Sequence, residues 1–402
     1  MSMNETPSAE RAHIGFFGCR NAGKSSLVNA VTGQSLAIVS DVKGTTTDPV
    51  LKAMELLPLG PVVVIDTPGF DDEGALGELR VKRTLDALNR CDIAVLVIDA
   101  TLGMSKADEQ LLCQMRQRGL PHIVAWNKAD LLEALPAPSG CMAVSAMTGL
   151  NIDALKEALA RIMPDREQRR LLSDLVGPGD VAILVCPIDE SAPKGRLILP
   201  QQQAIRDLLD AGATAMVCRE TELAGALSSL AAPPRLVVTD SQAFREVSAV
   251  VPDSVPLTSF SILMARYKGF LEAAVAGVAA MDGLRDGDRV LMAEGCTHHR
   301  QCNDIGTVKI PRWLRAHTGA DLVIETCTGR DFPEDLSPYR LVIHCGGCML
   351  TETVVRYRMR AAQAQGVPFT NYGIAIARMT GTLERSLRLF PQIHALLAEG
   401  GR

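Results

Sequence analysis

Two short runs in this chain have residue types and spacings that suit chemistry, and they lie far apart in the sequence. Near the N-terminus, the run GCRNAGKS at residues 18–25 places two glycines before a lysine and a serine. Near the C-terminus, the run HCGGC at residues 344–348 places a histidine before two cysteines that are separated by two glycines. The first spacing is typical of phosphate binding, and the second is typical of metal or redox chemistry.

The N-terminal run has the context that a phosphate-binding loop requires. An apolar, strand-like stretch precedes it, and a stretch with helical apolar periodicity follows it. Glycines let backbone N–H groups close around phosphate oxygens, and the helix N-terminus adds positive potential. We expect Lys24 to neutralise the β- and γ-phosphates and Ser25 to ligate Mg²⁺. Such a loop alone does not distinguish GTP from ATP.

Four further runs follow in the order typical of a guanine-nucleotide switch: KGTTTD (43–48), DTPGF (66–70), NKAD (127–130) and SA (145–146). Asp66 ends an apolar run and can hold the Mg²⁺, while the Gly69 N–H can contact the γ-phosphate. The Asp130 carboxylate can pair with the N1 and N2 hydrogens of guanine, which adenine does not present. We therefore predict GTP and GDP as ligands. The predicted nucleotide-binding residues are Gly18, Asn21, Ala22, Gly23, Lys24, Ser25, Ser26, Thr45, Thr46, Asp66, Gly69, Asn127, Lys128, Asp130, Ser145 and Ala146.

The runs NAGKSSL, GTTTD and DTPGF resemble the Era/TrmE class of GTPases. In that class, the asparagine matching Asn21 helps to bind a K⁺ ion that substitutes for an arginine finger, and the threonine matching Thr46 contacts Mg²⁺. The resemblance implies catalytic roles for Lys24, Asn21 and Thr46, and it adds Thr46 to Ser25 as a metal ligand. Phe70 stands where many signalling GTPases have a water-orienting glutamine, so we expect slow intrinsic turnover.

Length and composition indicate a multidomain α/β protein and exclude several classes. The chain has 402 residues, of which 47% are hydrophobic, so we expect three domains. A net charge of −5 gives no general field for nucleic acid, and we expect the basic clusters REQRR (166–170) and VVRYRMR (354–360) on solvated helix faces. We find no signal peptide and no apolar run of about 18 residues. We therefore predict a cytoplasmic protein without a membrane partner.

The domain boundaries follow from changes in pattern along the chain. The GTPase motifs occupy residues 1–165, and the run LLSDLVGPGD at 171–180 has the Gly-Pro punctuation of a linker. Residues 175–262 alternate short strands with helices, which predicts a small parallel α/β domain without evident chemistry of its own. Residues 266–402 form the last predicted domain, which is also α/β.

The last domain contains a predicted metal crevice. The runs GDRVLMAEGC, ADLVIETC and YRLVIHCGGC are apolar strands that end at Cys296, Cys327 and the Cys345/Cys348 pair. In a parallel sheet these strand ends lie side by side, so remote thiols can converge at the carboxyl edge. Eleven cysteines in a long cytosolic chain do not indicate a disulfide framework, because that compartment keeps thiols reduced.

A Cys-x2-Cys pair alone is compatible with zinc, an iron–sulfur cluster or a redox dithiol. Cys296-x-His298 and His344 enrich the predicted crevice in metal ligands, which disfavours a simple dithiol. The chain has no second Cys-x2-Cys pair of the kind that usually completes a structural zinc site. The residues therefore favour a cluster with three cysteine ligands and one non-cysteine or exchangeable position.

The pattern Cys296-x-His298, followed after 46 intervening residues by Cys345-x2-Cys348 with His344 in front, resembles the signature of the FeFe-hydrogenase maturation GTPase family, HydF. The resemblance extends over the whole chain, as a GTPase domain, a dimerisation domain and a cluster-binding domain. It implies a 4Fe–4S cluster held by Cys296, Cys345 and Cys348.

The resemblance leaves the fourth ligand open. His298 and Glu294 are the candidates, Cys302 and Cys327 lie close enough in the sequence pattern to compete, and an exogenous ligand is a further alternative. An incomplete ligand set can accept and release an exogenous group.

The resemblance implies a homodimeric scaffold or carrier. It would receive a two-iron subcluster precursor from radical-SAM maturation enzymes and deliver it to apo-hydrogenase, with GTP hydrolysis regulating partner exchange. One alternative is an Era/TrmE-type GTPase that acts in RNA modification or ribosome assembly, although the acidic balance favours no nucleic-acid partner. Another is a structural zinc protein with a GTPase domain.

Overall fold

The computed structural model describes residues 7–34, 50–70, 75–132, 138, 140–164, 170–188, 197–295, 304–329 and 331–399. The chain divides into two compact units, Met1–Arg166 and Glu167–Arg402.

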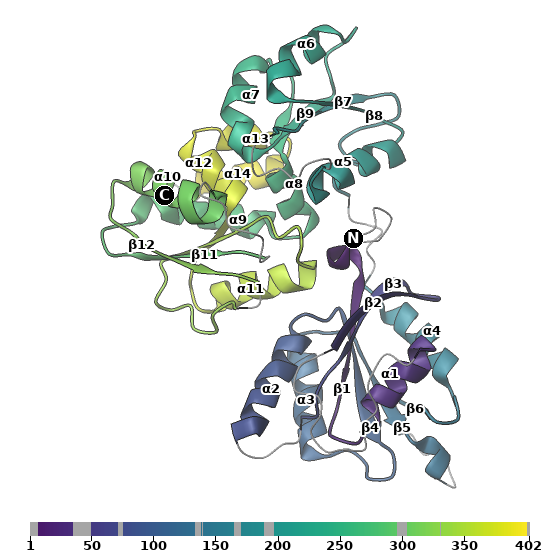
Figure 1. Ribbon diagram of the computed structural model, residues 1–402. Helices are drawn as coiled ribbons and strands as arrows, with labels where there is room; N and C mark the ends of the chain where they lie inside the picture. Colours follow the sequence, from purple (N-terminus) through teal and green to yellow (C-terminus); the bar gives the residue numbers. More distant parts are fainter. Residues whose placement is uncertain are drawn as a thin grey trace. The chain divides into compact units, whose positions relative to one another are not determined.

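The first unit is built on a six-stranded sheet with the strand order β2-β3-β1-β4-β5-β6 (Figure 1). Its pairs are parallel except β2 with β3. Helices α1 and α4 cover one face, and α2 and α3 cover the other. The strands are β1 (Ala12–Phe17), β2 (Val50–Leu56), β3 (Gly60–Asp66), β4 (Ile93–Asp99), β5 (His122–Asn127) and β6 (Cys141–Ala143). The helices are α1 (Lys24–Thr32), α2 (Ala75–Leu88), α3 (Lys106–Gln117) and α4 (Ile152–Ile162), with 3₁₀ turns η1 (Ser8–Glu10) and η2 (Ala129–Leu131).

The sequence explains this arrangement locally. Every residue of β1, AHIGFF, is buried, as expected for a central parallel strand covered on both faces. Helix α3 begins at a capping box, in which the Ser105 side chain accepts from the Asp108 N–H and the Asp108 carboxylate accepts from the Ser105 N–H.

The second unit contains two four-stranded parallel sheets, β10-β9-β7-β8 and β12-β11-β13-β14. The strands of the first are β7 (Val181–Val185), β8 (Thr214–Cys218), β9 (Leu236–Thr239) and β10 (Leu257–Ser259). Those of the second are β11 (Arg289–Ala293), β12 (Val323–Cys327), β13 (Leu341–His344) and β14 (Phe369–Asn371). In Figure 1, α11 covers one face of the second sheet, and α9, α10 and α12 lie on the other.

The helices of this unit are α5 (Leu199–Asp210), α6 (Leu223–Ser228), α7 (Phe244–Val250), α8 (Phe260–Tyr267), α9 (Leu271–Val278), α10 (Ile310–Thr318), α11 (Glu352–Ala364), α12 (Tyr372–Met379), α13 (Leu383–Leu387) and α14 (Pro391–Glu399). The short turns are η3 (Glu220–Glu222), η4 (Ser241–Ala243), η5 (Ala279–Gly283) and the π-helical η6 (Ile305–Lys309).

One continuous core joins the two sheets. It contains Leu184 of β7, Leu263 of α8, Leu291 of β11 and Ile343 of β13. Helix α13 also contacts the β10-β9-β7-β8 sheet, where the Thr258 hydroxyl of β10 donates to the Ser386 carbonyl oxygen at 3.0 Å. The second and third predicted domains therefore form one compact unit because they share buried apolar surface.

The α/β class and the parallel sheets agree with the sequence prediction. Residues 171–180, expected to form a linker, contain no helix or strand, but the first two of them are not solvated. Leu171 and Leu172 are buried in the core of the second unit. The N–H groups of Leu172 and Ser173 both donate to the Asp207 carboxylate of α5, at 2.6 and 2.7 Å. Burial of the two apolar leucine side chains is favourable, so the start of this segment packs into the second unit. No helix in the described ranges is both long and apolar enough to cross a bilayer.

Two helical glycines provide a test of the packing in the second unit. A Cβ on Gly277 of α9 would lie 2.2 Å from the Phe369 carbonyl oxygen of β14, whereas a Cβ on Gly225 of α6 would meet nothing within 4 Å. We predict that Gly277→Ala destabilises the protein by about 1–3 kcal/mol through overpacking. Gly225→Ala should be neutral or stabilising by about 0.5–1 kcal/mol. Chemical denaturation measures both, and equal stabilities would contradict this close helix–strand approach.

Candidate nucleotide and metal sites

The phosphate-binding loop connects β1 to α1 and has three residues with positive φ: Gly18 (+142°), Asn21 (+62°) and Gly23 (+87°). A Cβ on Gly18 would lie 2.2 Å from the Val97 carbonyl oxygen, and one on Gly23 would lie 2.3 Å from Asn127 Nδ2. Both glycines are therefore required by space as well as by backbone conformation. Asn21 is exposed and is one of the residue types that tolerate the left-handed region.

The two residues expected at the phosphates and the metal lie at the start of α1. Lys24 is buried, and its Nζ donates to the carbonyl oxygens of Gly18, at 3.0 Å, and Cys19, at 2.7 Å. Ser25 Oγ donates to Asp66 Oδ2 at 2.6 Å. Lys24 thus bends back over the loop, and Ser25 lies against the carboxylate at the end of β3.

Asp66 has an unused oxygen. Its Oδ1 is buried and has no hydrogen-bond partner among the described residues. Burial raises the pKa of Asp66, against the opposing effects of the Ser25 hydrogen bond and the Lys24 charge. A buried carboxylate oxygen beside a serine hydroxyl suits a hard divalent cation, so the residues present fit Mg²⁺.

The base-binding runs converge on the same loop through Asn127. Its Nδ2 donates to the Ala22 carbonyl oxygen at 2.9 Å, and its Oδ1 accepts from the Ala146 N–H at 3.1 Å. Asn127 therefore holds the phosphate loop and the 145–146 segment together. Lys128, which has a φ of +64°, pairs with Asp99 at 2.5 Å.

The remaining predicted nucleotide-binding residues differ in exposure and in their contacts. Asp130 is exposed in η2, and Ser145 is buried, its Oγ accepting from the Thr148 N–H at 3.1 Å. A Cβ on Gly69 would lie 3.0 Å from the Arg20 nitrogen, so the two segments pass closely. Ser26 is half-buried in the first turn of α1. Thr45 and Thr46 lie outside the described residues.

Phe70 is only 9% exposed and belongs to the apolar cluster of β1, β3, α2 and α3. Its ring has no polar atom with which to hold an attacking water. This agrees with the expectation from sequence that the position does not supply a catalytic glutamine.

The second site lies at the carboxyl edge of the β12-β11-β13 sheet. Ala293 of β11 is paired with Cys327 on one side and with His344 on the other. The Glu294 N–H donates to the Cys327 carbonyl oxygen at 2.9 Å, and the Cys345 N–H donates to the Ala293 carbonyl oxygen at 2.8 Å. The described strand ends therefore lie side by side, as the sequence predicts. Cys296, His298 and Cys302 lie outside the described residues.

The Cys345–Cys348 loop is held by the backbone around it. Cys345 Sγ accepts from the N–H groups of Gly295, at 3.1 Å, and Gly347, at 3.3 Å. Such contacts favour a thiolate and its metal complexes. Gly347 has a φ of +62°, so the loop turns back at that residue, and Cys348 follows half-buried.

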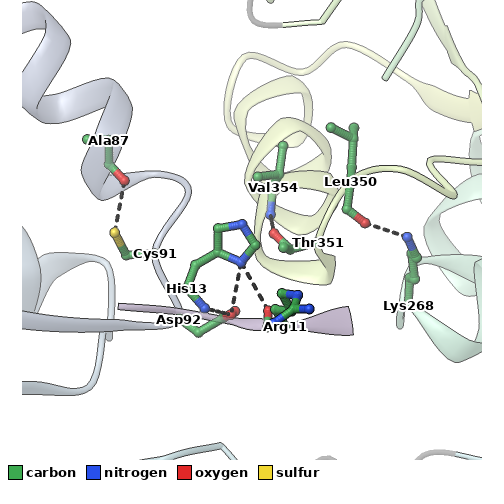
Figure 2. A network of polar contacts seen from close by, with 9 residues as sticks. All are labelled: Arg11, His13, Ala87, Cys91, Asp92, Lys268, Leu350, Thr351 and Val354. Carbon is green, nitrogen blue, oxygen red and sulfur yellow. Dashed lines mark hydrogen bonds and ion pairs between the residues drawn. The ribbon is translucent and has the colours of Figure 1, made fainter. Parts of the chain in front are cut away.

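Lys268, just after α8, holds the same loop from the other side. Its buried ammonium donates to the carbonyl oxygens of Gly347 and Leu350, and Figure 2 shows it reaching Leu350, where the Nζ–oxygen distance is 2.5 Å. The sequence pattern did not single out Lys268, because a long-range contact of this kind leaves no local signal.

Two of the fourth-ligand candidates are described, and their environments differ. Glu294 is buried, and its Oε1 accepts from the Tyr372 hydroxyl at 3.4 Å. Burial raises the pKa of the Cys327 thiol to about 11, although the Arg358 charge opposes this. Burial therefore disfavours the thiolate of Cys327 in the absence of a metal.

His344 does not present a nitrogen to the crevice. The ring is completely buried, with Nδ1 2.6 Å from the Cys345 carbonyl oxygen and Nε2 3.2 Å from Arg358 Nη1. Burial, and then the Arg358 charge, lower the pKa of His344 to about 3. The neutral ring thus donates from Nδ1 and accepts at Nε2. The expectation that His344 adds to the metal ligands is wrong, because both of its nitrogens are used.

Arg358 was also misplaced by the sequence prediction. It belongs to the VVRYRMR cluster expected on a solvated helix face, yet its side chain is only 3% exposed. It lies three residues after Val355 and one before Met359, both on the buried side of α11. This helical spacing is the signal that would have placed it inside.

The described residues contain no group of three or more His, Cys, Asp or Glu side chains placed to hold a metal ion. Cys296 and His298, which the predicted ligand set requires, are outside that search. The described donors at this edge still fit an iron–sulfur cluster, because Cys345 Sγ already accepts two backbone N–H groups in a half-buried loop.

The first unit has the fold and motifs of a P-loop GTPase domain. Residues 13–128 match the 50S ribosome-binding GTPase family. Residues 171–269 match the Hydrogen maturase F dimerization domain, and residues 272–389 match the Hydrogen maturase F tetramerization domain. These last two matches together cover more than half of the chain, and they follow the GTPase domain in order. The chain belongs to the hydrogen maturase F family.

Individual relatives match the GTPase domain. GTPase Der of Kosmotoga olearia is 40% identical over 124 residues, covering 30% of this chain and 28% of that protein. The tRNA modification GTPase MnmE of Laribacter hongkongensis is 34% identical over 156 residues, covering 37% of this chain and 34% of that protein. The chain thus spans about a third of the length of these relatives or less.

The chain is also similar to solved structures of GTPases. Era from Aquifex aeolicus bound to GDP and aluminium fluoride is 21% identical with a TM-score of 0.35, covering 51% of this chain and 91% of that chain. The G domain of FeoB from T. maritima is 23% identical with a TM-score of 0.29, covering 38% of this chain and 99% of that chain.

The comparisons agree with the predicted family and the three-domain order. They also add a feature, since the region that we assigned to cluster binding matches a family named for tetramerization. The matched families describe self-association through both domains of the second unit.

Proposed function

We propose that the chain is a GTP-hydrolysing scaffold and carrier that holds a 4Fe–4S cluster and delivers a two-iron subcluster precursor to apo-FeFe-hydrogenase. The observation that carries this proposal is the Cys345–Cys348 loop, whose first sulfur accepts two N–H groups at the edge of a parallel sheet. Membership of the hydrogen maturase F family supports it. The precursor is cargo, received from radical-SAM maturation enzymes.

In this proposal Cys296, Cys345 and Cys348 hold the cluster. Glu294 is the favoured protein ligand for the fourth iron, because it directly follows β11 and its carboxylate is buried beside Gly306 and Tyr372. His298, Cys302, Cys327 and an exogenous ligand remain alternatives. When bound, the cluster supplies an iron site at which an exogenous group can be exchanged.

The GTPase residues have separate roles. Lys24 and the loop N–H groups bind the phosphates, Ser25, Thr46 and Asp66 ligate Mg²⁺, and Asp130 reads guanine. Asn21 contributes to K⁺ binding. GTP binding at the segments 43–48 and 66–74 regulates exchange of partners rather than the metal chemistry; residues 43–48 and 71–74 lie outside the described residues.

We place the domain boundaries at residues 1–165, 175–262 and 266–402, with a homodimer formed through the middle domain. The shared core of the second unit supports joint rather than independent folding of its two domains. Thiolate ligands require a reducing compartment, so we place the protein in the cytoplasm.

The alternative is a GTPase that acts on RNA, which the MnmE likeness of the first domain favours. It offers no role for the cysteine loop, and the chain carries a net charge of −5. The two proposals differ in whether iron binding is needed for function.

The first prediction concerns hydrolysis. With Asn21 at the phosphate loop and Phe70 buried, we expect slow GTP turnover that rises when K⁺ replaces Na⁺. Asn21→Ala should remove the potassium response and keep nucleotide binding. Steady-state phosphate release in matched salts measures this, and identical rates in the two salts would overturn the K⁺ assignment.

The second prediction concerns the cluster. Anaerobically reconstituted protein should bind about four irons per chain. Cys345→Ser and Cys348→Ser should lose the iron and keep the wild-type GTPase rate, because they lie in a different compact unit from the phosphate loop. Cys113→Ser, at an exposed position on α3, should lose neither. Full iron retention in Cys345→Ser would contradict the ligand assignment.

The third prediction tests the carrier role directly. Wild-type protein that has been loaded by the radical-SAM enzymes should activate apo-hydrogenase, whereas Cys348→Ala should not. Lys24→Ala should hold its cluster but mature the hydrogenase poorly when precursor must be loaded afresh. If loaded wild-type protein cannot activate the apo-enzyme, the carrier role fails and the RNA-linked alternative gains support.

A further inference from the structure

Arg358 is a buried charge at the centre of the cysteine-bearing strand ends. Its Nη1 donates to the Glu294 carbonyl oxygen at 3.3 Å and to His344 Nε2 at 3.2 Å, and its Nη2 donates to the Gly329 carbonyl oxygen. These three partners follow or end β11, β13 and β12. The guanidinium therefore contacts the carboxyl ends of all three strands.

Its described partners carry no negative charge. Two are carbonyl oxygens, one is a neutral imidazole, and the Phe332 ring lies with its centroid 5.0 Å from Arg358 Cζ. Arg358 forms no ion pair with a carboxylate among the described residues.

This arrangement is costly unless a negative group is added. A guanidinium stays protonated in proteins, and burying an ion without a counter-ion costs several kcal/mol. The thiols of Cys327 and Cys345 lie near enough that their negative charge would favour the protonated form of Arg358. The sulfur of Cys345 accepts hydrogen bonds from two backbone N–H groups.

An iron–sulfur core held by three thiolates carries net negative charge, and that charge grows by one when the cluster accepts an electron. A fixed positive charge at this place stabilises both forms, and it stabilises the reduced form more. His344 then has a defined role, because its neutral Nε2 holds the guanidinium in place and is not a ligand to iron.

We propose that Arg358 is the counter-charge of the bound cluster and raises its reduction potential, with His344 as the positioning residue. The inference rests on the proposed function, because it requires that the Cys345 loop holds an iron–sulfur cluster. It assigns a buried arginine, outside the ligand set, to the electronic properties of the site.

The test compares charge with geometry in the full chain. Arg358→Gln removes the charge but keeps a hydrogen-bond donor. Arg358→Lys keeps the charge but loses the planar guanidinium, which can donate to several partners at once. Arg356→Gln is the matched control, since Arg356 lies on the same helix, is more exposed and is already paired with Glu352 at 2.8 Å. Each reconstituted protein is assayed for iron and titrated electrochemically, with the reduced cluster followed by its paramagnetic signal.

We expect Arg358→Gln to favour the oxidised cluster at least tenfold, a shift of about 59 mV to more negative potential for a one-electron couple. Arg358→Lys should stay close to wild type, and Arg356→Gln should match it. An iron-loaded Arg358→Gln with the wild-type potential overturns the inference and leaves the proposed function intact.

The remaining outcomes distinguish an effect of the Arg358 charge from an effect on loop geometry. If Arg358→Gln fails to hold iron while Arg358→Lys holds it at the wild-type potential, the charge is what the cluster needs. If Arg358→Lys also loses iron, or if its reduction potential falls as far as that of Arg358→Gln, the residue acts through loop geometry and the inference fails. Wild-type protein that binds no cluster overturns the proposed function itself.

Discussion

The register of three parallel strands is the constraint on which the second unit depends. Ala293 lies between Cys327 and His344 on the neighbouring strands, so the residues that follow β11, β12 and β13 emerge at one edge. Parallel pairing with even hydrogen bonds leaves no freedom to shift one strand without moving its buried side chains to the other face. The cysteine loop, the buried Glu294 and the Arg358 contacts all follow from this alignment.

Both candidate sites contain a buried charged group whose natural complement is a ligand. In the first unit, Asp66 uses one carboxylate oxygen for Ser25 and leaves the other buried without a hydrogen bond to any described residue. In the second unit, Arg358 is surrounded by neutral acceptors. Burial disfavours a charged group, and a bound ion of opposite sign would stabilise it.

Lys268 connects the core shared by the two sheets of the second unit to the Cys345–Cys348 loop. Lys268 follows α8, which packs in the core shared by both sheets, and its ammonium donates to two carbonyl oxygens of that loop. A rearrangement of α8 would change the donors available to the Cys345–Cys348 turn. The region that matches the dimerization domain therefore connects directly to the Cys345–Cys348 loop through Lys268.

The sequence by itself determined the phosphate loop, the guanine-reading run and the parallel strands that end in cysteines. These features depend on contiguous residues, whose spacing sets local backbone geometry, such as the positive φ angles at Gly18 and Gly23. Only the tertiary structure decided that Leu172 is core rather than linker, that His344 has no nitrogen left for a metal, and that Arg358 is buried. Each of these depends on which distant groups surround a side chain, and desolvation and hydrogen bonding across the fold are not encoded in local spacing.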